Sequence, residues 1–329
     1  MQALRVQIEC WLRGALSSCW HTIGRLLETA LRRESHFKTV RVSEQKVTTP
    51  GEKTRTHGFD QLFSGDPGEG FRVKTGIVEL DEMLRGGFMP GDAVMLSGSA
   101  GTGKTTLAIQ YLVNGVKLGE PGIYVTFEEL PDQIYRDAKN FGWDLQRMEE
   151  EDKFRLVCTS PNLMLEAGDD SLLDDVIREV QSRRLVIDSL SHLEMFVTKD
   201  AMRTEAYRLV RHLKTRGVSS MLLWESPQIS GAAFNVADAG LSFLVDCIVA
   251  LKPVEIESSL RRALVILKMR GSDHDKRLRE YEITPHGVLV SKPFSQYEGL
   301  MSGSPTRSMT DEAANSWAFA FAKNKQKHS

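Results

Sequence analysis

The fold is decided by one stretch of the sequence, Ala93-Val94-Met95-Leu96-Ser97-Gly98-Ser99-Ala100-Gly101-Thr102-Gly103-Lys104-Thr105-Thr106. The apolar run at 93–96 predicts a buried strand, and residues 105–113 have the pattern of a helix. Residues 98–105 match the pattern G-x-x-x-x-G-K-[ST] at every fixed position. A strand, a glycine-rich loop and a helix in this order predict a phosphate-binding loop.

The residue types in this loop suit a nucleoside triphosphate. Glycines let backbone N–H groups converge on phosphate oxygens, and the start of the helix adds partial positive charge. We expect Lys104 to neutralise the β- and γ-phosphates of ATP and the Thr105 hydroxyl to ligate Mg²⁺. The expected nucleotide-binding residues are Gly98, Ser99, Ala100, Gly101, Thr102, Gly103, Lys104, Thr105 and Thr106.

Three acidic residues, at the ends of two predicted strands, complete the predicted site. Asp188 ends the apolar run 184–187, where a second magnesium ligand is expected, although an aspartate at a strand end can also cap a helix. Glu128 and Glu129 end the run 122–127, which we expect to lie beside the strand that precedes the phosphate loop. One carboxylate would orient and polarise the attacking water while the other tunes it, and Glu128 is the favoured base.

Apolar runs alternate with helical patterns from about residue 71 to 290. This alternation predicts an α/β fold with a mostly parallel sheet covered by helices, and the closely spaced late runs predict an antiparallel extension. The expected strands are 93–97, 122–127, 154–158, 184–187, 219–224, 247–251 and 263–269.

Composition narrows the class further. The chain has 329 residues, 41% apolar and 26% charged, with a net charge of −2, which excludes collagen-like and wholly disordered proteins. This balance gives no overall attraction to nucleic acid, and we expect the basic residues Arg211, His212, Lys214 and Arg216 to form a solvated helix face.

The same sequence indicates a cytoplasmic protein. Its four cysteines, Cys10, Cys19, Cys158 and Cys247, form no CxxC pair and are expected to be reduced thiols. The longest apolar stretch, 241–251, is interrupted by Ser242 and Asp246 and is predicted to be a buried strand rather than a membrane span. No signal peptide is expected at the N-terminus.

Four regions are expected along the chain. Residues 1–34 form an amphipathic helix, 35–70 a flexible linker, 71–295 the nucleotide-binding domain and 296–329 a mobile tail. The helix is expected to dock on the core or to pair with a copy of itself, and contact with a membrane surface is the alternative. A start codon downstream of this helix is a further alternative.

Together these motifs resemble the RecA superfamily of ATPases, and within it the KaiC family of circadian-clock ATPases and autokinases with their single-domain relatives. The resemblance covers about residues 71–307 and implies a RecA-like core. Besides the phosphate loop, it rests on Thr75-Gly76, Leu80-Asp81, Gly86-Gly87-Phe88, Val125-Thr126-Phe127-Glu128-Glu129, Phe141-Gly142-Trp143, Ile187-Asp188-Ser189-Leu190, Lys268-Met269-Arg270-Gly271-Ser272, His274-Asp275-Lys276, Ile283-Thr284 and Ser302-Gly303-Ser304-Pro305-Thr306-Arg307.

The resemblance implies a hexameric ring with ATP between subunits. Lys268 and Arg270 of one subunit would then reach the γ-phosphate held by its neighbour; two solvated basic residues are the alternative. Ser242 aligns with a family phosphoacceptor serine, while Phe243 and Ala237 stand where threonines are expected, which argues against a two-site phosphorylation cycle. The motif 302–307 resembles the start of a C-terminal segment that binds a regulatory protein.

Three functions therefore compete. The favoured one is an ATP-hydrolysing oligomeric switch, with serine autophosphorylation as an added activity. The second is a DNA-dependent motor of the RadA or helicase type, although the sequence has no zinc ribbon and no evident basic loop with aromatic residues for single strands. The third is an ATP-gated scaffold with little turnover, anchored through residues 1–34.

Overall fold

The computed structural model describes residues 71–161, 171–226, 241–295, 297–301 and 306–307, and the architecture given below is theirs. The predicted N-terminal helix (1–34), the predicted linker (35–70) and most of the predicted tail (296–329) lie outside the described residues, as does Ala237.

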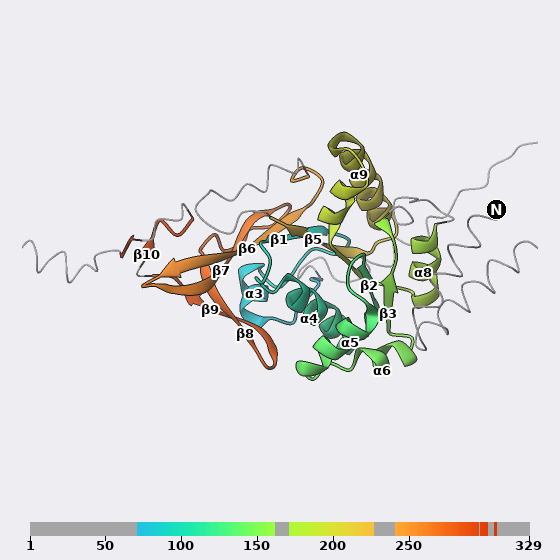
Figure 1. The fold of residues 1–329 in the computed structure, drawn as a ribbon, viewed down its shortest axis with the longest axis horizontal. Coiled ribbons are helices and arrows are strands. Elements are labelled where there is room, and N and C mark those ends of the chain that lie inside the picture. Colours follow the sequence, from blue (N-terminus) through green and yellow to red (C-terminus); the bar gives the residue numbers. More distant parts are fainter. Residues whose placement is uncertain (1–70, 162–170, 227–240, 296, 302–305, 308–329) are drawn as a thin grey trace, which may run out of the picture. The chain divides into compact units, whose positions relative to one another are not determined.

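A nine-stranded sheet forms the centre of the described part. Its strands are β1 Ala93–Gly98, β2 Gly122–Thr126, β3 Phe154–Cys158, β4 Arg184–Asp188, β5 Ser219–Glu225, β6 Cys247–Ile256, β7 Ser259–Met269, β8 Arg279–Thr284 and β9 Gly287–Pro293. They lie in the order β3-β2-β4-β5-β1-β6-β7-β8-β9 (Figure 1). The six strands from β3 to β6 are parallel and the rest continue antiparallel, which confirms the predicted fold class.

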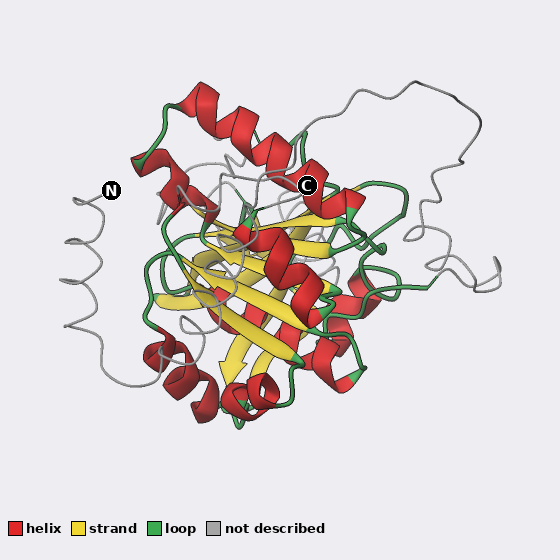
Figure 2. Cartoon of the chain, turned by 90° about the vertical axis from the view of Figure 1, so that its right-hand side faces the viewer, coloured by secondary structure: helices red, strands yellow, loops and turns green. Residues whose placement is uncertain are grey.

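Helices cover both faces of this sheet (Figure 1 and Figure 2). They are α3 Val78–Met83, α4 Lys104–Lys117, α5 Pro131–Asn140, α6 Leu145–Glu150, α8 Leu172–Val180, α9 Lys199–Thr215 and the 3-10 helix η1 Leu190–Met195. Alternation along β1 serves both layers: Val94 and Leu96 join the core on the α4 side, while Ala93 and Met95 join the core on the α9 side. Burial on both faces explains why these strands read as continuous apolar runs. Within the described residues, no helix combines the length and apolarity needed to cross a bilayer.

The antiparallel extension packs against α4 and the phosphate loop. The backbone N–H of Val288 donates to Gln110 Oε1 at 2.7 Å, which ties β9 to α4. Tyr281 of β8 is buried in the same core as α4. The extension therefore helps to fix the helix that follows the loop. A separate pair, β10 Tyr297–Glu298 and β11 Thr306–Arg307, includes the end of the motif at 302–307, whose first residues are not described.

The position of β2 differs from the expected one. It pairs with β3 and β4, so that β4 and β5 separate it from β1, and the prediction that the two strands are neighbours was wrong. Order along the chain does not set order across a sheet when crossover connections intervene. Because all these strands are parallel, Glu128 and Glu129 still leave β2 at the edge of the sheet that carries the phosphate loop.

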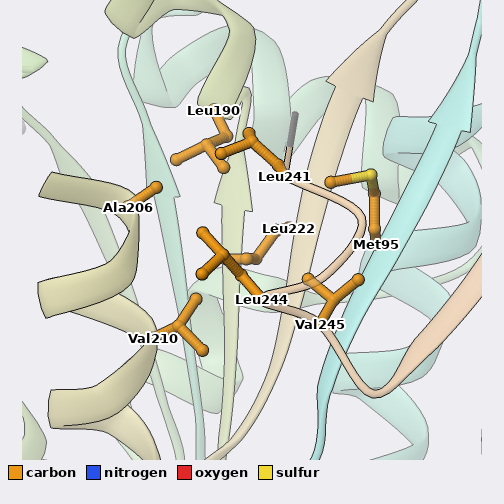
Figure 3. A pocket seen from close by; sticks show the side chains of 8 residues that line it. All are labelled: Met95, Leu190, Ala206, Val210, Leu222, Leu241, Leu244 and Val245. Atoms are coloured by element: carbon orange, nitrogen blue, oxygen red, sulfur yellow. The ribbon is translucent and has the colours of Figure 1, made fainter. Parts of the chain in front are cut away.

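The stretch 241–251 is only partly a strand. Strand β6 begins at Cys247, and a turn occupies residues 242–244. Leu241, Leu244 and Val245 point into an apolar cluster with side chains of α9 and β5 (Figure 3). These residues are apolar because they anchor the turn, not because they continue a strand.

The basic residues of α9 do not form a simple solvated face. His212 Nε2 and Arg216 Nε lie 3.0 and 2.7 Å from Oδ1 of Asp174, a residue of α8 that is fully buried. Lys214 Nζ lies 2.6 Å from Asp246 Oδ2. The prediction of a solvated face was wrong for His212, whose side chain is 12% exposed, whereas Lys214 and Arg216 keep 34% and 31% of their side chains exposed while they pair with acidic residues from other parts of the chain.

Candidate functional site

The phosphate loop leaves the end of β1 and enters α4 at Lys104. Gly103 has φ of 84°, and a Cβ there would lie 2.6 Å from Cδ1 of Ile283 on β8. At Gly98 a Cβ would lie 2.7 Å from Thr102 Oγ1. Glycine is therefore required at Gly103 by its backbone conformation and by the packing of β8, and at Gly98 by the tight fold of the loop.

Side chains brace the loop from both sides. The Thr102 hydroxyl donates to the Ser99 carbonyl at 2.7 Å, and the buried Tyr281 hydroxyl donates to the Thr102 carbonyl at 2.5 Å. Lys104 Nζ donates to the Gly98 and Ser99 carbonyls, both at 3.0 Å. Burial lowers the pKa of Lys104, and the nearby carboxylates of Glu225 and Asp188 oppose this shift. The ammonium is thus held at the loop itself.

A direct hydrogen bond between the two motifs joins Thr105 to Asp188. The Thr105 hydroxyl, in the first turn of α4, donates to Asp188 Oδ2 at 2.7 Å. The Tyr124 hydroxyl of β2 donates to the same oxygen at 2.5 Å. Burial raises the pKa of Tyr124 well above its ordinary value, so this hydroxyl remains a donor at any ordinary pH. A hydroxyl and a carboxylate side by side at a phosphate loop are hard oxygen ligands that fit Mg²⁺.

Glu128 and Glu129 occupy different environments beyond β2. Glu129 is partly buried, and its pKa is raised, first by burial and then by the negative charge of Asp188. The Glu128 side chain is 71% exposed, and its Oε2 lies 2.9 Å from Nε2 of His192. Glu129 is therefore influenced by the charge of Asp188, whereas Glu128 contacts His192 of η1.

His192 belongs to a set of polar residues of which the sequence analysis singled out only Ser189, within the motif 187–190. Its Nδ1 lies 2.8 Å from the Ser189 hydroxyl, which lies 2.7 Å from the Ser191 hydroxyl. Glu225, at the end of β5, contributes its charge near Lys104 and its backbone N–H to Ser191. Ser189 lies within the motif 187–190, but no sequence motif marks Ser191, His192 or Glu225, because their contacts depend on how the strand ends meet.

Lys268 and Arg270 lie on another part of the sheet. Lys268 pairs with Ile248 of β6, whereas Gly98, where the phosphate loop begins, pairs with Leu251. Three residues along a strand correspond to about 10 Å. Both cations bind the turn that precedes β6 instead of the loop of their own chain.

Both cations donate hydrogen bonds to backbone carbonyls at or close to Ser242. Lys268 Nζ donates to the Ser242 and Val245 carbonyls at 2.6 and 2.7 Å. Arg270 Nη2 donates to the Phe243 carbonyl at 2.9 Å. Lys268, near the end of β7, and Arg270, just after it, therefore both bind the segment that contains the candidate phosphoacceptor.

Comparison with known proteins gives a consistent picture. The family model described as "ATPase: KaiC" matches residues 73–295. The "Circadian clock protein KaiC3" of Synechocystis sp. is 34% identical over 234 residues, which cover 71% of this chain and 46% of the relative. The "Circadian clock oscillator protein KaiC" of Synechococcus elongatus is 34% identical over 241 residues, or 73% of this chain and 46% of that relative. The chain spans about half the length of these curated relatives.

Proposed function

Because the chain belongs to the KaiC family of ATPases, we propose that residues 98–106 bind Mg-ATP and that Glu128 and Glu129 promote hydrolysis of its γ-phosphate. The observation that carries the proposal is the 2.7 Å contact between Thr105 Oγ1 and Asp188 Oδ2. It joins the two motifs that a Mg²⁺-dependent phosphate loop requires, although they lie far apart in the sequence.

Each residue has a distinct task in this proposal. Backbone N–H groups of the loop and the Lys104 ammonium hold the β- and γ-phosphates. Thr105 and Asp188 would hold Mg²⁺, which when bound neutralises charge on the phosphate oxygens. Glu128 orients a water and accepts its proton as the water oxygen bonds to the γ-phosphorus; the bond to the bridging oxygen breaks, and ADP leaves with that oxygen. Glu129 lies close enough to Asp188 to adjust the charge at this edge.

Self-association completes the proposed site. Lys268 and Arg270 bind a turn of their own chain, away from its phosphate loop, which supports the view that they serve the nucleotide of a neighbouring subunit. An arginine supplied by a neighbour stabilises the charge of a phosphoryl group during transfer. We expect light scattering to show a ring, a hexamer by family resemblance, in the presence of Mg-ATP, and a strict monomer with and without it would contradict this part of the proposal. The tail, 296–329, would then carry the site for a regulatory protein.

The test of the proposed function is phosphate release by the full chain. Lys104→Ala is expected to lower the rate at least about 100-fold, because the charge that faces the phosphates is lost. Lys117→Ala, an exposed lysine in the last turn of the same helix, is the matched control and should hydrolyse ATP at the wild-type rate. Removal of Mg²⁺ with a chelator should abolish the activity of both the wild type and this control. Equal rates for the two lysine variants would contradict the proposal.

Autophosphorylation of Ser242 is a second candidate function. The observation that favours it is the contact of Lys268 with the Ser242 carbonyl, which brings the serine to the cations proposed to face a neighbour's nucleotide. The Ser242 hydroxyl oxygen would bond to the γ-phosphorus, the bond to the bridging oxygen would break, and the hydroxyl proton would pass to a carboxylate. Labelled ATP should mark the wild type and Ser258→Ala, an exposed serine control, but not Ser242→Ala. Equal label in Ser242→Ala would exclude this site.

A further inference from the structure

A continuous chain of hydrogen bonds leads to the carboxylate of Glu128. It starts at the backbone N–H of Glu225, which donates to the Ser191 hydroxyl oxygen at 3.3 Å. It continues through Ser189, whose hydroxyl oxygen lies 2.7 Å from that of Ser191 and 2.8 Å from His192 Nδ1. It ends where His192 Nε2 lies 2.9 Å from Glu128 Oε2.

The donors and acceptors of this chain allow one consistent direction when the imidazole is neutral. The Ser191 hydroxyl donates to Ser189, the Ser189 hydroxyl donates to Nδ1 of His192, and Nε2–H donates to the ionised Glu128. An ionised carboxylate can only accept, so Glu128 selects the tautomer with the proton on Nε2, and the Ser189 hydroxyl, which can donate or accept, donates to Nδ1 of that tautomer. Ser189 is 4% exposed and follows Asp188 directly, which anchors the chain at the end of β4.

The exposed Glu128 side chain needs such a partner to hold it in one position. Its side chain is 71% exposed, whereas the His192 side chain is 24% exposed. A free glutamate side chain samples many rotamers, and a group that accepts a proton from water works best when it is held in one position. Among the described residues, His192 is the side chain that binds the Glu128 carboxylate.

We propose that His192 is a positioning residue for hydrolysis, which holds the Glu128 carboxylate through Nε2–H while the Ser189 hydroxyl supports that tautomer by donating to Nδ1. This inference rests on the proposed function, because it assigns a partner to the proposed base. It adds a residue that no motif of the phosphate loop contains. Glu128 is the ionisable side chain that contacts the imidazole, and Glu225 enters the hydrogen-bond chain through its backbone N–H.

Two amide substitutions separate positioning from simple packing. In His192→Gln the amide nitrogen can occupy the place of Nε2 and donate to Glu128. In His192→Asn the shorter amide matches Nδ1 and can reach Ser189 but not Glu128. We expect kcat for ATP hydrolysis to stay within about 3-fold of wild type in His192→Gln and to fall about 10-fold in His192→Asn, with KM for ATP within about 2-fold in both.

The parallel measurements keep this inference distinct from the proposed function. In a Glu128→Gln background, His192→Asn should cause no further loss of single-turnover rate, because the two residues act through one contact. Wild-type kcat in His192→Asn, an equal loss in both amide variants, or a change in KM alone would overturn the inference. If Lys104→Ala is inactive in the same assay, the proposed function stands even when the inference fails. A wild-type chain without hydrolysis would overturn both.

Discussion

At the scale of single residues, Asp188 depends on two hydroxyl donors. The Thr105 and Tyr124 hydroxyls lie 2.7 and 2.5 Å from its Oδ2. Thr105 belongs to the phosphate-loop motif, but Tyr124 lies within the buried strand β2. A buried hydroxyl that orients a metal-binding carboxylate acts on metal affinity without contacting the metal.

Tyr124→Phe should therefore weaken the response to Mg²⁺. Loss of the donor is expected to raise the Mg²⁺ concentration for half-maximal hydrolysis about 10-fold, while stability falls by only about 1 kcal/mol. Tyr111→Phe is the matched control, since Tyr111 is equally buried but its hydroxyl donates to the Ser219 carbonyl at 3.4 Å. Identical Mg²⁺ dependence in the two variants would refute the role given to Tyr124.

A second single-residue effect concerns Asp92, just before β1. Burial, followed by the negative charge of Asp246, raises the pKa of Asp92 to about 6. A carboxyl with a raised pKa binds its proton more tightly in the folded state, so its contribution to stability is full below the unfolded value and is lost as pH rises through about 6. Asp92 thus opposes folding at neutral pH.

Asp92→Asn should make the protein more stable than wild type at about pH 8, by about 1 kcal/mol once solvent screening is allowed for, and the gain should shrink at about pH 5. Urea unfolding at the two pH values measures this difference. Asp200→Asn, at a side chain that is 96% exposed, is the control and should show little change. A gain for Asp92→Asn that does not depend on pH would contradict the cause given.

At the scale of single residues, the sequence predicted the site residues that belong to a recognisable motif. The loop residues match a motif with fixed spacing, Asp188 ends an apolar run, and the structure brings Thr105 and Asp188 together. Tyr124 and His192 escaped prediction because a tyrosine in an apolar run and an isolated histidine resemble ordinary structural residues. Only the meeting of β2, β4 and η1 gives them partners.

At the scale of elements, a buried arginine joins β4 to α4. Arg184, at the start of β4, is 0% exposed, and its guanidinium lies 4.6 Å from the ring centroid of Tyr111. Nη1 donates to the Lys74 and Tyr111 carbonyls at 2.8 and 2.7 Å, and Nε donates to Glu120 Oε2 at 2.6 Å. One side chain thus connects both motif-bearing elements at the end opposite to the phosphate loop.

Arg184→Met is expected to lower the free energy of unfolding by about 3 kcal/mol, because the Glu120 carboxylate and two carbonyls lose their partner. Arg183→Met, at the exposed neighbouring position, should change it by less than about 0.5 kcal/mol. Denaturant unfolding of both variants gives the comparison. Adding Glu120→Gln should recover part of the loss, and equal costs at positions 183 and 184 would contradict this account.

The bounds of a strand were predicted well where the strand coincides with a short apolar run. Strand β3 has the predicted bounds, and β1 and β2 differ by one residue at one end. Strands β6 and β7 run further than expected, since Lys252 and Pro253 break the apolar pattern but still pair with Ala263 and Arg262. The place of β2 was missed because no local pattern encodes which strand becomes its neighbour.

At the scale of the whole molecule, the candidate groups divide into two sets. Thr105, Asp188, Glu128 and Glu129 gather at the edge of the sheet that carries the phosphate loop, whereas Lys268 and Arg270 bind the turn before β6. A heterologous contact between copies would bring one set to the other and can close into a ring. This arrangement underlies the proposal that each nucleotide is served by two chains.

The most direct test is ATP hydrolysis by an equimolar mixture of Glu128→Gln and Arg270→Ala chains, each of which is expected to hydrolyse ATP far more slowly than wild type on its own. In a randomly mixed ring, a site with its own Glu128 and a neighbour's Arg270 occurs at about a quarter of the interfaces, so about a quarter of the wild-type activity should return. A mixture as inactive as its components, or full activity of Arg270→Ala alone, would contradict a nucleotide site shared between chains.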